Sequence, residues 1–216
     1  MKRNDISMKI APDGIPVVAF SGFMFIGSLI FVPVISPVFV VLTFSLAWFF
    51  RDPERTMPGE EDCWVSPADG RVVELSEGDH PFMGSAGHKI GIFMSVLDVH
   101  VNRSPFTGVV EHLEYVPGEK MMAFNEKASE KNERMYVGLT TEKGPLLLVQ
   151  IAGFLARRIV CRLSKGDVLQ KGQRFGMIKL GSRVDVYLPP GVEPRVRIGD
   201  RVRAGASIIG VTTDEK

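Results

Sequence analysis

The chain has 216 residues, of which 45% are hydrophobic, and this is enough to bury one compact core. Its 26 Lys and Arg residues nearly balance its 25 Asp and Glu residues, so the composition indicates neither nucleic-acid binding nor a charged, disordered arm. The two cysteines, Cys63 and Cys161, lie far apart and match no paired-cysteine motif, which gives no disulfide framework and favours reduced thiols in the cytoplasm.

A long uncharged run, Ile15 to Phe50, occupies the N-terminal part of the chain. One membrane-crossing helix needs roughly 20 apolar residues. This run is longer and is interrupted by Pro33 and Pro37, which predicts that residues 1–50 form a membrane-anchoring helical hairpin. Each arm is short for a full crossing, so the hairpin either crosses twice or re-enters. Basic residues flank both ends, which predicts a place in the cell membrane with the remainder on the cytoplasmic side.

Short apolar runs separated by glycine turns dominate residues 51–216, which predicts one β-rich domain and a mainly β (α+β) fold class. The segment 121–133 is expected to be loop-like or briefly helical. The predicted strands are Arg71–Leu75, Lys89–Met94, Val109–Val116, Pro145–Ile151, Arg158–Leu163, Arg174–Leu180 and Arg183–Leu188.

Two segments echo each other, "KGDVLQKGQRFGMI" from Lys165 and "IGDRVRAGASIIGV" from Ile198. Both contain a Gly-Asp pair and a second glycine six residues after the first, a duplicated turn motif that is typical of barrel-sandwich-like β domains. Neither copy has the lysine-bearing hairpin tip of the biotinyl and lipoyl carriers. The similarity therefore concerns architecture only.

Three residues could together form a nucleophile, a base and an orienting group. Ser182 follows Gly181 where a predicted strand should be continuous, His100 lies where an apolar strand ends in a polar run, and Asp69 sits in a Pro-x-Asp-Gly turn. Each feature alone has a plain structural explanation; Asp-Gly is an ordinary turn pair. No His-x-His, His-x-x-x-His or cysteine pair occurs, so no metal site is predicted. The other histidines, His80, His88 and His112, are predicted to be loop or strand-surface residues.

A set of motifs resembles the short bacterial and archaeal form of the phosphatidylserine decarboxylases. In chain order they are "FFRDPER", "SPADG", "SVLDVHVNRSP", "YVPGEK", "NER", "GFLARR" and "RFGMIKLGSRVDVYLP". The resemblance spans nearly the whole chain from Arg51 onward. It implies a zymogen that cuts itself between Gly181 and Ser182 into a large β chain (1–181) and a small α chain (182–216), and that turns Ser182 into a covalent pyruvoyl group without metal or pyridoxal phosphate.

The resemblance also implies the chemistry. His100 would accept the Ser182 proton and Asp69 would hold the imidazole in the useful tautomer. After maturation, the pyruvoyl group would bind the substrate amine as a Schiff base, and phosphatidylserine would lose carbon dioxide to give phosphatidylethanolamine. Arg103 stands where longer relatives have a second histidine, so His100 would act alone.

Three arginines are candidate contacts for the anionic headgroup: Arg183, Arg157 and Arg158. For the last two, a solvated or ion-paired strand edge is the simpler interpretation. The expected partners are a phospholipid substrate, the membrane, and the associated large and small chains, with a dimer of such pairs as the assembly; no nucleic-acid partner is expected.

Other functions stay open from the sequence. A non-enzymatic, membrane-anchored adaptor would explain the apolar run and the Gly-Asp echo but not Asp69, His100 and Gly181-Ser182, and no heptad pattern indicates the coiled-coil arm of such adaptors. An inactive relative, or a decarboxylase of an archaeal ether-lipid analogue, would share the same motifs.

Overall fold

The structure, a computed structural model, describes residues 8–84, 87–118, 131–153, 158–179 and 181–213. The chain separates into two compact units, Met1–Glu54 and Arg55–Lys216. The boundary lies after Glu54 rather than after residue 50, because strand β2 (Arg51–Pro53) pairs with β1 (Met8–Ile10) and so belongs to the first unit.

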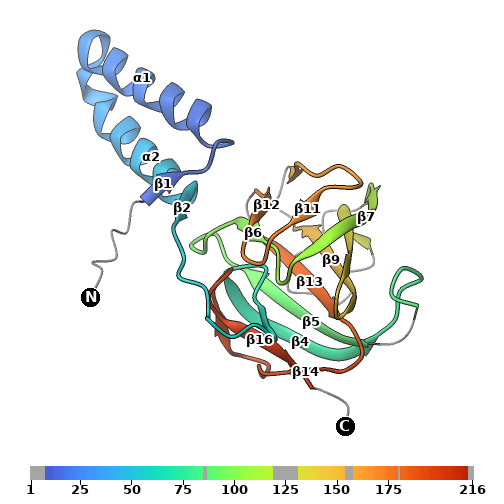
Figure 1. The fold of residues 1–216 in the computed structure, drawn as a ribbon. Coiled ribbons are helices and arrows are strands. Elements are labelled where there is room, and N and C mark those ends of the chain that lie inside the picture. The colour runs from blue at the N-terminus through green and yellow to red at the C-terminus, as the bar shows by residue number, and fades with distance from the viewer. Residues whose placement is uncertain (1–7, 85–86, 119–130, 154–157, 180, 214–216) are drawn as a thin grey trace. The chain divides into compact units, whose positions relative to one another are not determined.

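The first unit contains two helices, α1 (Ile15–Phe31) and α2 (Ser36–Phe49), joined by the 3-10 turn η1 (Pro33–Ile35). They lie side by side (Figure 1). A proline stands in the first turn of each helix, where its missing N–H costs no hydrogen bond. Large apolar side chains along both helices are exposed. Neither described helix combines the length and hydropathy required for a bilayer crossing.

The second unit is mainly β, as predicted, and an eight-stranded antiparallel sheet forms most of it. The sheet curls around the core (Figure 1). Its strand order is β11 (Val168–Leu169), β7 (Gly108–Val116), β8 (Arg134–Thr141), β9 (Gly144–Ala152), β13 (Ser182–Leu188), β5 (Gly87–Met94), β4 (Gly70–Gly78) and β15 (Arg201–Val202).

Two three-stranded sheets complete the unit. They are β10 (Ile159–Cys161), β12 (Arg174–Ile178) and β6 (Val101–Arg103) in one, and β14 (Val192–Pro194), β16 (Ile208–Thr212) and β3 (Cys63–Val65) in the other. All seven predicted strands have counterparts, in β4, β5, β7, β9, β10, β12 and β13. The main strand that was not predicted is β8, where Gly138 and two threonines weaken the apolar alternation. Most of the segment 121–133, predicted as a loop or brief helix, lies outside the described residues.

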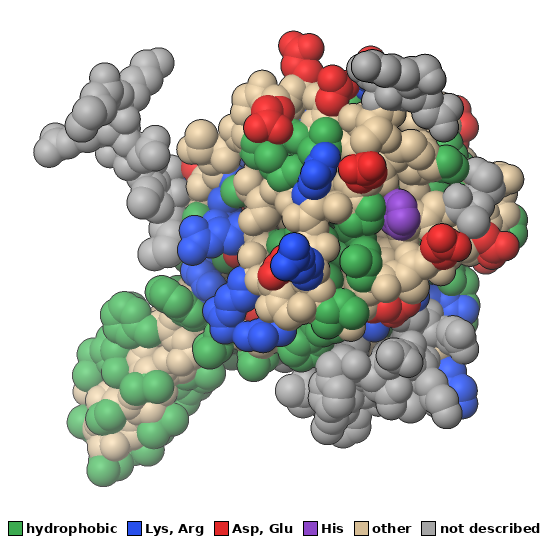
Figure 2. All heavy atoms as spheres, turned by 90° about the horizontal axis from the view of Figure 1, so that it is seen from below, with side chains coloured by type: hydrophobic (Ala, Val, Ile, Leu, Met, Phe, Trp, Pro, Cys, Tyr) green, Lys and Arg blue, Asp and Glu red, His purple; other side chains and the backbone are tan. Residues whose placement is uncertain are grey.

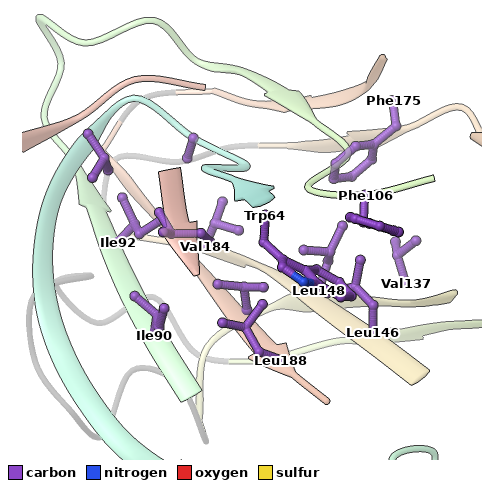
Figure 3. Close-up of a cluster of buried hydrophobic side chains, with 14 of the residues drawn as sticks. Trp64, Ile90, Ile92, Phe106, Val137, Leu146, Leu148, Phe175, Val184 and Leu188 are labelled. Carbon is purple, nitrogen blue, oxygen red and sulfur yellow. The ribbon is translucent and has the colours of Figure 1, made fainter. Parts of the chain in front are cut away.

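The core fills the concave side of the sheet (Figure 3). Trp64 stacks on Phe106 with ring centroids 4.4 Å apart. Alternate residues of β13, Val184 and Leu188 among them, are fully buried there, because successive side chains of a strand point to opposite faces. Each such side chain contributes about 1.5–3 kcal/mol on burial. Ser182 shares the parity of Val184 and therefore faces the core.

The two Gly-Asp segments contact two turns that share the pattern Ser-Pro-x-x-Gly-x-Val, Ser66–Val72 and Ser104–Val110. Matching backbone hydrogen bonds of 2.8–2.9 Å run from Val72 N to Asp200 O, Val110 N to Asp167 O, Gly205 N to Ser66 O and Gly172 N to Ser104 O. The register shifts that follow also match, at Val72/Glu74 and at Val110/His112. The two Gly-Asp segments contain β15 and β11, which lie at opposite edges of the large sheet.

Candidate active site

Gly181 and Ser182 stand at the start of β13, next to the centre of the large sheet. Gly181 adopts φ +57°, the left-handed conformation that costs other L-residues about 1–2 kcal/mol. A Cβ built there would meet nothing within 4 Å, so the backbone conformation rather than crowding favours glycine. Ser182 pairs with Met94 of β5 and with Ala152 of β9. The serine is thus fixed from two sides, directly after a backbone bend.

The Ser182 hydroxyl is fully buried, and its Oγ lies 3.4 Å from the Met94 thioether sulfur. Two further buried polar side chains lie at the same sulfur or beyond it. Asn102 Nδ2 is 3.9 Å from Met94 Sδ, and Gln150 Nε2 donates to Asn102 Oδ1 over 2.8 Å. Buried amides of this kind are rarely placed without a purpose in packing or chemistry. Neither residue was predicted to have a role, although Gln150 interrupts an otherwise apolar strand.

His100 is fully buried and lies just before β6. Its carbonyl accepts from Ile178 N over 3.4 Å, and β6 pairs with β12, the strand that leads toward Gly181. The ring Nδ1 is 2.9 Å from the carbonyl oxygen of Asp98. Because a carbonyl can only accept, this contact requires the proton on Nδ1, and the neutral ring then carries its lone pair on Nε2.

Asp69 is buried in the Ser66–Val72 turn, but its contacts differ from those predicted. Its Oδ2 accepts from Arg55 over 2.7 Å and its Oδ1 accepts from Ala204 N over 2.8 Å. Burial raises the pKa of the Asp69 carboxyl, against the opposing effects of Arg55 and the Ala204 N–H; the charge of Asp98 adds to the rise. The tautomer-setting contact of His100 is therefore made by the Asp98 carbonyl.

The Asp69 turn nevertheless lies against the segment that carries His100. Arg103 N, three residues after His100, donates to Pro67 O over 3.0 Å. Arg103 itself is buried and donates to Gly172 O over 3.2 Å. At the spacing of the second histidine of longer relatives, this chain thus has an arginine that contacts the backbone.

Arg183 is buried on the opposite face of β13 from Ser182. It donates to Asp185 over 2.5 Å and to Glu74, and Lys89 also contacts both carboxylates. Gly91 makes room for this network, since a Cβ there would lie 2.5 Å from the Arg183 guanidinium. Burial would raise the pKa of Glu74, but hydrogen bonds from Arg183 and Lys89 outweigh it and hold the pKa at about 2. These contacts give Arg183 a structural place, away from the Ser182 face.

The remaining predicted contacts are less informative. Arg158 is exposed, and Arg157 lies outside the described residues. Within the described part of the chain, no three His, Cys, Asp or Glu side chains are grouped so that they could hold a metal ion.

These features define a β-rich enzyme domain with a candidate nucleophile at a strand start and a buried histidine beside the same segment. A family model described as phosphatidylserine decarboxylase matches residues 42–210. Three similar proteins are each named phosphatidylserine decarboxylase proenzyme. That of Chlorobium luteolum is 46% identical over 88% of this chain and 92% of its own length. That of Chlorobium phaeovibrioides is 50% identical over 82% and 81%, and that of Symbiobacterium thermophilum 46% over 90% and 95%.

The chain belongs to the phosphatidylserine decarboxylase family. The family is pyruvoyl-dependent and its members are carboxy-lyases. Membership disfavours the adaptor alternative, which offered no explanation for Gly181-Ser182 and His100.

Proposed function

We propose that Ser182 is the precursor of the pyruvoyl group and that the chain cuts its own backbone before this residue. The protein decarboxylates phosphatidylserine to phosphatidylethanolamine, as its family does. The observation that carries the proposal is the left-handed Gly181 followed by a buried serine held between β5 and β9. The bend allows the Ser182 hydroxyl to approach the Gly181 carbonyl, while the strand pairing keeps the reacting residue in place.

The proposed cleavage balances without a further reagent except water. Ser182 Oγ attacks the Gly181 carbonyl carbon, the peptide C–N bond breaks, and an ester and a free amine result. Loss of the Ser182 Cα proton then breaks the Cβ–Oγ bond, which leaves a Gly181 carboxylate and dehydroalanine. Tautomerisation and hydrolysis release ammonia and leave the pyruvoyl cap. Its carbonyl supplies the electron sink for the loss of carbon dioxide from the substrate.

His100 is the proposed general base, through Nε2, for the Ser182 hydroxyl proton. The Asp98 carbonyl holds the tautomer that this role requires. Met94 is only a weak acceptor for the hydroxyl, so little binding energy is lost when the proton moves to the imidazole. In the mature enzyme the same ring could position the substrate carboxylate or donate the proton that replaces carbon dioxide.

Asp69 is proposed to act on His100 through its charge rather than by direct orientation. Its turn packs beside the His100 segment through the Arg103–Pro67 hydrogen bond, and a nearby carboxylate favours the imidazolium that forms on proton transfer. Arg55, which lies in a quoted motif but was given no role, fixes Asp69 Oδ2.

We also propose that the catalytic unit is a duplicated, barrel-sandwich-like β fold. The matched turns and Gly-Asp segments support this proposal.

We also propose that α1 and α2 form the helical hairpin that anchors the chain at the cell membrane, with the catalytic unit on the cytoplasmic side. The exposed apolar side chains of both helices and the lipid nature of the substrate support this proposal. The processed large and small chains would stay associated, because β13 pairs with β5 and β9 of the large chain. A dimer of such pairs, and activity on an ether-lipid analogue, stay predictions.

Intact mass under denaturing conditions tests the proposal without substrate. The natural chain should give two fragments divided at Gly181, the smaller one blocked at its N-terminus and lighter than a serine start predicts. Ser182→Ala should give one full-length mass, whereas Ser207→Ala, a matched serine change in the small chain, should be cut normally. A full-length mass for the natural chain that persists in a preparation with decarboxylase activity would overturn the proposal.

A further inference from the structure

The loop between β5 and β6 presents an apolar tip to solvent. Leu97 is 72% exposed and Val96 44% exposed. The loop is nevertheless ordered, because Asp98 Oδ2 accepts from both the backbone N (2.8 Å) and the Oγ (2.7 Å) of Ser95. This ordered loop holds a leucine in water three residues before His100, which indicates an apolar contact outside this chain.

Two exposed arginines, Arg71 of β4 and Arg201 of β15, are direct cross-strand partners. Arg203, also exposed, follows on the same edge of the sheet. Like charges directly opposite each other destabilise a sheet. None of the three forms an ion pair with any residue in the described part of the chain. Lys and Arg side chains gather along one margin of the β-rich unit in Figure 2.

The arginines and the apolar loop lie at the same end of the sheet. Arg71 pairs with Phe93, near the end of β5, and the loop begins at Ser95. The Asp98 charge also acts on the carboxyl of Asp69, two residues before Arg71, where it helps to raise the pKa. Cationic and exposed apolar groups therefore border one another beside the His100 segment.

The opposite edge of the sheet shows that the fold does not require arginines here. In the matching turn, Val109 of β7 takes the place of Arg71, and Val168 of β11 takes the place of Arg201. These valines are direct cross-strand partners too, and both are exposed. Folding therefore does not explain the presence of the arginine pair.

We propose that Val96, Leu97, Arg71, Arg201 and Arg203 form a docking surface for an anionic phospholipid bilayer. The apolar tip enters the interfacial region, and the guanidinium groups contact lipid phosphates and carboxylates, as Arg does well. The charge fits, because the substrate is itself an anionic lipid. The surface would bring the segment that carries His100 close to the headgroup plane. The proposal rests on the lipid nature of the substrate and not on the anchoring role proposed for α1 and α2.

The test compares the full-length natural protein with an Arg71→Gln/Arg201→Gln variant on two forms of substrate. One form is phosphatidylserine at a fixed low fraction in phosphatidylcholine vesicles, with or without phosphatidylglycerol; the other is short-chain phosphatidylserine below its micelle concentration. The measured quantity is the ratio of kcat/KM for vesicles to kcat/KM for dispersed substrate. We expect this ratio to fall about fivefold for each arginine at low salt, the equivalent of about 1 kcal/mol per basic residue, and the stimulation by phosphatidylglycerol to disappear. Leu97→Ser should lower the ratio as well.

A charge-matched control adds Val109→Arg/Val168→Arg to the double variant, which moves the arginine pair to the opposite edge of the sheet. The low ratio should persist in this protein. Recovery of the ratio would mean a non-specific effect of net charge and would overturn the proposal. An unchanged ratio in the double variant would also overturn the proposal. If that ratio is unchanged because activity falls equally on both substrates, the arginines would be headgroup or structural residues.

Discussion

The Ser66–Val72 and Ser104–Val110 turns share a sequence pattern and backbone hydrogen bonds, but Asp69 in the first stands where the second has Thr107. In the first, Ala204 N donates to Asp69 Oδ1 over 2.8 Å; in the second, Lys171 N donates to the Thr107 hydroxyl over 3.0 Å. Asp69 is buried against Arg55, whereas Thr107 is exposed. A hydroxyl is therefore sufficient to accept the backbone N–H at this position of the turn. The fold does not require the carboxylate and its arginine at this position, and this supports the role proposed for Asp69.

The largest expected effect distinguishes two histidines that lie before and after the Ser104–Val110 turn, His100 and His112. His100→Gln should slow self-cleavage by about 10²–10⁴-fold, the usual contribution of a general base. His112→Gln is the matched control, because His112 lies in β7, beyond the Thr107 turn, and should cleave at the natural rate. The appearance of the small chain with time, measured by mass spectrometry, gives both rates. Equal rates for the two variants would remove His100 from the mechanism.

Asp69→Thr gives the Ser66–Val72 turn the residue type that the Ser104–Val110 turn has at the same position, and so tests the comparison directly. The thermal midpoint should stay within a few degrees of the natural value, because the Ala204 N–H keeps an acceptor, while cleavage and decarboxylation should fall at least about tenfold. Thr107→Asp is the reciprocal change and should leave both rates unaltered. Should Asp69→Thr unfold the protein, the carboxylate would be needed for folding and the comparison would fail.

Glu74 and His112 follow the matching register shifts in β4 and β7, but only Glu74 belongs to the buried network with Arg183. The pKa of Glu74 is about 2, below its ordinary 4.5, so its stabilising effect is present above pH 4.5 and is lost as pH falls toward 2. We expect the free energy of unfolding to drop by about 1–3 kcal/mol over that range. Glu74→Gln should flatten this part of the curve; an unchanged slope would mean that other carboxylates control it.

The smallest effect concerns the space that the network occupies. Gly91→Ala places a methyl group against the Arg183 guanidinium and should lower the free energy of unfolding by about 1–2 kcal/mol, since overpacking displaces buried groups. Gly59→Ala is the control, because a Cβ at Gly59 meets open space. Gly84→Ala is not suitable, because Gly84 has a positive φ. Urea unfolding of both variants measures the difference, which would vanish if the guanidinium could move aside freely.

The sequence alone identified the β-rich unit and the three residues that now form the centre of the proposal, because strand alternation and motif order are local. Arg183 shows where such reasoning ends. It was a candidate headgroup contact as the neighbour of Ser182, but adjacent strand residues point to opposite faces, and register alone brings Glu74 and Asp185 to it. Likewise, Asn102 and Gln150 lie 48 residues apart and meet only through packing. Asp69 was found by its motif, and Arg55 also lies in a quoted motif, but the contact between the two was not predicted.

The place of β13 in the sheet also determines how a cut protein can come apart. Residues after Gly181 supply β13, close to the middle of the large sheet, and also β14, β15 and β16. Once the backbone is severed, unfolding releases two separate molecules, and refolding becomes a second-order reaction that must reinsert an interior strand. The mature enzyme would therefore be long-lived because it opens slowly, and its thermal midpoint would rise with protein concentration, whereas the uncut precursor would refold as a single molecule.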